Sequence, residues 1–193
     1  KALKYNNHFP PYMELYCKLY ITKNKKEFIK ILKKYWLDNP NPNIEKCVNY
    51  SFSELDNLNK VKTLSKILVK NDNVFYKHLI LGKFKYNAKI WGSSKNDFNK
   101  SIAINPSKEA YHYLSKIEEG INNNRIKSKE LQKLYHSCSE IYFWRCKSCN
   151  RLHQRWISYC NMCNQFDSIK AINDNIFSSS TVKTKMLIEQ PKL

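Results

Sequence analysis

Glycine is nearly absent from this sequence, with 3 residues in 193, and no glycine-rich loop of the kind that cradles phosphate occurs. An all-β sandwich needs many tight turns, and these usually contain glycine. Because glycine is scarce, helix is the favoured secondary structure. A nucleophile elbow and a metal-binding His-Glu pair are also missing. We therefore predict a mostly α-helical protein that is not an enzyme.

Long apolar runs are missing too. No stretch of about 18 apolar residues could span a bilayer, and no basic, apolar and small-residue succession marks a signal peptide. The sequence begins at Lys1 and soon enters a helical pattern. From this we expect a fragment of a membrane-associated protein whose spanning segment lies upstream.

Arginine is scarce in a strongly basic chain. The formal charge is +18, but the chain has 30 lysines against 4 arginines, together with 23 asparagines. Such a charge is typical of nucleic-acid or anionic-membrane binding. Lysine and asparagine both have A-rich codons, however, so an AT-rich genome accounts for the excess without selection for a ligand. Nucleic acid is therefore an alternative partner here and not the favoured one.

Three groups of apolar residues recur at spacings of three and four, the period of an α-helix. They comprise Tyr12, Leu15, Tyr16 and Leu19; Phe28, Ile31, Leu32, Tyr35 and Trp36; and Leu58, Val61, Leu64, Ile67 and Leu68. Breaks are predicted at 39–42, which holds two prolines, and at the Asn-Asp-Asn sequence of 71–73. Ser53 and Ser94 each precede an aspartate by three residues, which predicts two helix N-caps.

Residues 76–106 follow the tetratricopeptide pattern of two helices. The matching positions are His78, Leu81-Gly82, Ser94, Phe98 and Pro106, in the spacing of that repeat. Gly82 and Ser94 are small where the helices would cross, and Phe98 would fill the gap. Counting back 34 residues places Leu64 in register with Phe98, so we predict two and a half to three repeats. A generic helical bundle is the alternative.

Two further helices are predicted, from Ser107 to about Ile121 and from Lys127 to Ser137, as the cap on which a second module docks. That module is indicated by two Cys-x-x-Cys pairs, with ten residues between them. Two such turns bring four sulfurs around one ion, a set typical of structural zinc. The metal ligands are predicted to be Cys146, Cys149, Cys160 and Cys163.

Asn150 and Asn164 follow the two cysteine pairs, at positions that call for a left-handed backbone. Iron in the same ligand set would give a rubredoxin-like electron-transfer centre, which is the alternative to zinc. We interpret His153 as a surface residue, since four sulfurs complete the shell. Cys17, Cys47 and Cys138 are interpreted as buried or exposed thiols without a role.

Three of the four arginines, Arg145, Arg151 and Arg155, fall within this short segment. Arginine suits docking of an anionic partner, but it also offsets the charge of a metal thiolate site and packs on Trp144 or Trp156. Both interpretations stay open. The predicted domains are a helical repeat domain at 1–138, a zinc ribbon at 139–172 and a flexible tail at 173–193.

Several stretches together resemble the C-terminal part of the HemY-type tetratricopeptide proteins, especially those of alphaproteobacteria. They are Trp36 with the 39–42 break, Leu81-Gly82 through Gly92, 106–111 with 114–119, and Trp144 to Ile169 with Trp156 and Phe166-Asp167. A repeat domain joined to a rubredoxin-like module is also similar to lipopolysaccharide assembly protein B. The resemblance implies an inner-membrane protein, with its soluble part on the cytoplasmic side, that organises protein complexes linked to heme or envelope metabolism.

Together these features predict a non-catalytic scaffold that holds protein partners on a helical-repeat surface. The repeat pattern places Tyr76, Leu79, Lys83 and Tyr86 on the concave face, where a partner would bind. The two alternatives are a basic zinc-ribbon protein that binds nucleic acid and an iron electron-transfer module.

Overall fold

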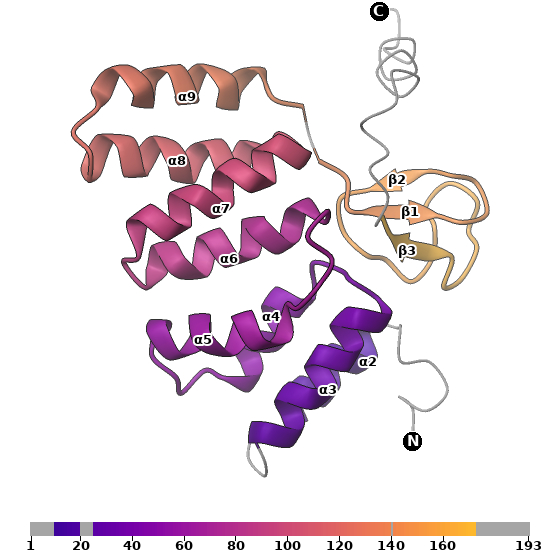
Figure 1. Ribbon diagram of the computed structural model, residues 1–193. Coiled ribbons are helices and arrows are strands. Elements are labelled where there is room, and N and C mark those ends of the chain that lie inside the picture. Colours follow the sequence, from indigo (N-terminus) through magenta and orange to yellow (C-terminus); the bar gives the residue numbers. More distant parts are fainter. Residues whose placement is uncertain (1–9, 20–24, 140, 173–193) are drawn as a thin grey trace, which may run out of the picture.

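A computed structural model describes residues 10–19, 25–139 and 141–172 (Figure 1). Within these ranges the chain forms eight helices and then a small antiparallel sheet of order β2-β1-β3. The helices are α2 (Pro10–Leu19), α3 (Lys25–Asp38), α4 (Ile44–Ser51), α5 (Asn57–Ile67), α6 (Phe75–Asn87), α7 (Trp91–Ile104), α8 (Lys108–Gly120) and α9 (Arg125–Ser137). The strands are β1 (Trp144–Cys146), β2 (Leu152–His153) and β3 (Ile169–Ala171). The predicted mostly α-helical class is confirmed, and none of the described helices is long and apolar enough to cross a bilayer.

The helices from α5 onward lie side by side in chain order, and α6 with α7 and α8 with α9 form the closest pairs (Figure 1). One continuous apolar core runs through the stack, with Trp36, Leu64 and Phe98 fully buried in it. The predicted break at 39–42 separates α3 from α4, and the predicted turn at 71–73 separates α5 from α6.

Gly82 is the point at which α6 and α7 approach most closely. A methyl group added at Gly82 would lie 2.7–3.0 Å from three ring carbons of Phe98, which is fully buried. Ser94 Oγ donates a hydrogen bond of 2.8 Å to the Gly82 carbonyl oxygen. The predicted roles of Gly82, Ser94 and Phe98 in the helix crossing therefore match the observed packing.

His78 and Lys85, which depart from the residue types of the repeat pattern, both face Asp97 on α7. Lys85 Nζ lies 2.5 Å from one Asp97 carboxylate oxygen, and His78 Nδ1 lies 3.6 Å from the other. Burial acts to raise the pKa of Asp97, but His78 and Lys85 outweigh it and hold the pKa below its usual value. A buried polar group therefore replaces apolar packing between these two helices.

Both predicted serine caps are wrong. Asp56 itself caps α5, since its carboxylate accepts a 2.8 Å hydrogen bond from the Asn59 amide. Ser94 lies inside α7, which begins at Trp91, and its hydroxyl is bound to α6.

The apolar face predicted for the first helix is also wrong. α2 buries Met13 and Cys17 against α4, whereas Leu15 and Leu19 are 53% and 70% exposed. The buried face is the one that meets Cys47 and its neighbours on α4. Packing against α4, and not the periodicity of the sequence, therefore determines which face of α2 is buried.

We expect Gly82→Ala to lower the free energy of unfolding by about 1–2 kcal/mol. The added methyl group overlaps the Phe98 ring, and overpacking of this kind outweighs the gain of roughly 1 kcal/mol in helix propensity. Gly92→Ala is the matched control, because nothing lies within 4 Å of its added methyl group. Urea unfolding of both variants tests this, and equal stabilisation by the two substitutions would contradict the close crossing.

Candidate metal centre

The second module contains two turns that share one pattern of backbone hydrogen bonds. In the first knuckle, residues 146–151, the Cys146 amide donates to the Arg151 carbonyl at 2.9 Å and the Asn150 amide donates to the Cys146 carbonyl at 3.0 Å. The second knuckle, residues 160–165, repeats both bonds: Cys160 N to Gln165 O at 3.1 Å and Asn164 N to Cys160 O at 2.8 Å. Each turn aims two sulfurs at the space between the knuckles.

The asparagine that follows each cysteine pair has a left-handed backbone. Asn150 has φ of 61° and Asn164 has φ of 54°. Asparagine adopts this conformation more readily than other residues with a side chain. The prediction from the cysteine spacing is therefore confirmed at both knuckles.

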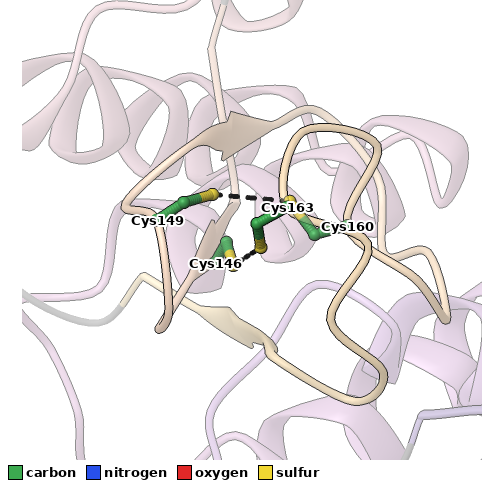
Figure 2. A group of neighbouring side chains, drawn as sticks. All are labelled: Cys146, Cys149, Cys160 and Cys163. Carbon is green, nitrogen blue, oxygen red and sulfur yellow. Dashed lines mark hydrogen bonds between the residues drawn. The ribbon is translucent and has the colours of Figure 1, made fainter.

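The four cysteine sulfurs converge on one point (Figure 2). All of them lie within 4.8 Å of one another, with Cys146 and Cys163 at 3.6 Å and Cys149 and Cys160 at 3.5 Å. Four sulfurs at 2.3 Å from a tetrahedral ion would lie about 3.8 Å apart. All seven cysteines of the chain are free, so this cluster could hold a metal ion.

Hydrogen bonds prepare Cys146 to be a thiolate. Burial acts to raise its pKa, but the Ser168 hydroxyl and the backbone amides of Cys149 and Ser148 bring the pKa down to about 5. Ser168 Oγ lies 3.2 Å from the sulfur. Ser168 was missed from the sequence, because a serine five residues beyond the last cysteine carries no recognisable signal.

The other sulfurs show why a cation fits here. The pKa of Cys160 is lowered, first by the backbone amide of Cys163. For Cys149, the Arg151 amide lowers the pKa, but desolvation and the neighbouring sulfurs raise it to about 12. Four adjacent thiols therefore do not all ionise by themselves. A bound cation would offset their repulsion and allow a full set of thiolate ligands.

His153 is not the surface residue that we expected. It is 8% exposed, and its Nε2 lies 3.6 Å from Cys160 Sγ. Pairing of β2 with β1 sets His153 opposite Trp144 and so turns it inward. Burial lowers its pKa, which favours the neutral ring beside the sulfurs.

The three arginines are spread over the module. Arg145 is half-buried on the central strand, where it lies opposite Lys170, whereas Arg151 and Arg155 are exposed. None of the three forms an ion pair with a described acidic residue. Trp144 is buried in the small core, so it is not a surface for stacking.

Two residues of the predicted concave surface are not accessible. Tyr76 and Leu79 are buried in the core, and the Tyr76 hydroxyl donates a 2.5 Å hydrogen bond to the Pro40 carbonyl. The prediction that they meet a partner fails because the chain itself covers them. Lys83 is half-buried between Glu45 and Glu109, and Tyr86 packs on Trp91 and Tyr113.

The ring contacts of the module are with α6, whereas we expected the α8–α9 pair to receive it; the start of α8 also borders the junction. The Phe143 ring stacks on Phe75 at 5.7 Å and meets Tyr76 edge-on at 6.4 Å. The same residue joins the module, since the Ile172 amide donates to its carbonyl at 2.9 Å. A cleft of about 210 Å³ remains at this junction, lined by Leu79, Ser107, Lys108, Glu109, Ser139, Ile141, Phe143 and Gln154.

We expect Phe143→Ala to loosen the module from the stack without disturbing the cysteine cluster. Loss of the two ring contacts should raise amide hydrogen exchange and protease cleavage near residues 141–143. Tyr142→Ala is the control, because this half-buried neighbour is not packed against either core. Equal effects of the two substitutions would show that Phe143 is not the anchor.

No protein-family profile matches this chain, and a search of characterised proteins finds no significant sequence match. The resemblance to HemY-type proteins therefore remains a prediction. The geometry of the cysteine cluster and of the helix stack carries the functional interpretation.

Proposed function

We propose that this protein is a non-catalytic binding scaffold in which one structural zinc ion holds a two-knuckle module beside a stack of helices. The observation that supports this most is the convergence of four sulfurs within 4.8 Å. An ion with four thiolate ligands has no open position for water or substrate, so such a site stabilises the fold and does not activate a nucleophile.

Zinc is the metal that we propose, because a closed set of four cysteines is a common structural zinc site. Iron in the same set would be a one-electron centre. Metal analysis of the purified chain separates the two, since we expect one zinc per chain and a colourless protein. A coloured protein that holds iron would replace the scaffold by an electron-transfer function, and a chain without metal would remove the proposal.

We further propose that α6 and α7 are a tetratricopeptide-like pair and that the scaffold role resides on the helical stack. Support comes from the contact of Gly82 with Phe98 and from the hydrogen bond of Ser94 to Gly82. Lys83 joins three helices, because it pairs with Glu45 of α4 at 2.6 Å and with Glu109 of α8 at 2.9 Å. Such a rigid, ordered face suits protein recognition.

Affinity capture from the native source tests the scaffold role. The bait is the metal-loaded chain, and the comparison is a chain with Lys83→Ala and Tyr86→Ala, which alters the accessible part of this face. We expect a protein that the first bait retains and the second loses. Capture of the same proteins by both baits would contradict recognition through this face.

A further inference from the structure

The second knuckle carries three large exposed side chains. Tyr159 is 54% exposed, Met162 is 70% exposed and Phe166 is 53% exposed. The rings of Tyr159 and Phe166 lie 5.1 Å apart, and the two residues form an antiparallel bridge at the base of the knuckle. Met162 lies between the two cysteines of the turn. These side chains form an apolar patch on the module, which lies at one end of α6 (Figure 1).

The fold of the knuckle does not require this patch. The first knuckle has the same pair of backbone hydrogen bonds. At its base, Arg145 pairs with Leu152 in the positions that Tyr159 and Phe166 take in the second. One turn is therefore basic and the other aromatic on a shared frame. Exposed aromatic rings are thus not a requirement of this turn geometry, and Tyr159 and Phe166 are accessible to a ligand.

The module that carries the patch is rich in positive charge. Residues 141–172 contain five basic side chains and one acidic side chain, Asp167, which lies 3.1 Å from Lys170. The sulfurs of Cys149 and Cys160 are only 3.5 Å apart. Arg151 is two residues after Cys149 and Tyr159 is next to Cys160, so the backbones that carry these two side chains lie close together. Arg155 precedes Tyr159 by four residues, so their Cα atoms are at most about 14 Å apart.

We propose that this face of the module binds single-stranded nucleic acid. A base stacks on the exposed ring of Tyr159, which Phe166 supports from the side, and Arg151 and Arg155 contact phosphates. A protein partner fits less well, because a stable protein interface takes roughly 20–30 residues a side and this patch has three. A single strand of nucleic acid can bind through a few aromatic rings, on which its bases stack, and nearby basic side chains, which contact its phosphates. The inference rests on the proposed function, since the metal must order the knuckle.

The test uses the full chain, with its metal content measured first, and two labelled strands of equal length and the same base, oligodeoxyuridylate and oligouridylate. We expect binding that weakens steeply with salt, and a loss of about tenfold in Tyr159→Ala. Tyr159→Phe keeps the ring and should bind within about twofold of the unchanged chain. Tyr50→Ala is the control, since Tyr50 is a 38% exposed tyrosine on α4.

Arg155→Gln should reduce the slope of log affinity against log salt by about 0.7–1. Lys133→Gln, which removes an exposed charge on α9, should leave that slope unchanged. Preference for one strand tells RNA from DNA. Absence of binding at low salt would overturn this inference, and so would equal losses of affinity in Tyr159→Ala and Tyr50→Ala. If the same chain holds its metal, either result leaves the proposed function intact. A chain without metal would instead count against the proposed function.

Discussion

Removal of the proposed zinc ion is expected to unfold residues 141–172 and to leave the helical stack folded. The module has a core of four fully buried residues, Trp144, Cys146, Cys160 and Ile169, which is too small to fold without a metal or another cross-link. Metal binding to small zinc modules contributes roughly 10–16 kcal/mol near neutral pH, and this energy is the folding energy. A chelator, or the substitution Cys160→Ser, should therefore abolish protection in the module.

Hydrogen exchange followed by mass spectrometry locates the effect. We expect amides of 144–171 to lose protection, while those of α6, α7 and α8 keep it, because the stack has its own apolar core. Cys138→Ser is the matched control, as this cysteine lies outside the cluster. Protection that survives chelation throughout the module would show that the sulfurs are not its support. Loss of protection across the stack as well would show that the two parts fold as one unit.

Phe98→Ala will strongly destabilise the stack, with an expected loss of about 3–5 kcal/mol in the free energy of unfolding. The ring is fully buried, stacks on Tyr113 at 5.1 Å and fills the space that Gly82 leaves open. Denaturant unfolding measures the loss. A cost below about 1 kcal/mol would mean that the site collapses around the gap.

A double-mutant cycle makes the packing claim sharper. With Phe98 replaced by alanine, the methyl group of Gly82→Ala meets no ring, so its cost should disappear and its helix propensity should stabilise the protein slightly. The two substitutions should therefore be non-additive by about 1–3 kcal/mol. Additive losses would contradict the contact between Gly82 and Phe98.

Local chemistry explains why the convergence of the four cysteines could be predicted from the sequence. The spacing of Cys146 and Cys149 sets the turn, and Asn150 meets its backbone requirement within the same six residues. The same holds for the second knuckle. The crossing of α6 and α7 was predictable for a similar reason, since a small residue and a large one at fixed spacing indicate which positions touch.

The parts that could not be predicted depend on contacts between distant segments. Phe143 reaches α6 although the chain arrives from α9, and its ring packs on Phe75 and Tyr76 there. His153 turns inward because of strand register. In α2, both faces carry apolar residues, so periodicity alone did not show which would be buried.

X-ray absorption at the zinc edge identifies the atoms bound to the ion. We expect one zinc per chain with a first shell of four sulfurs at about 2.3 Å and no nitrogen or oxygen. A nitrogen or oxygen atom in the first shell would mean that His153 or water takes the place of one cysteine, and a bound water would make a catalytic role possible. A purified chain with no metal, or with its cysteines joined as disulfides, would show that the cluster is not a zinc site.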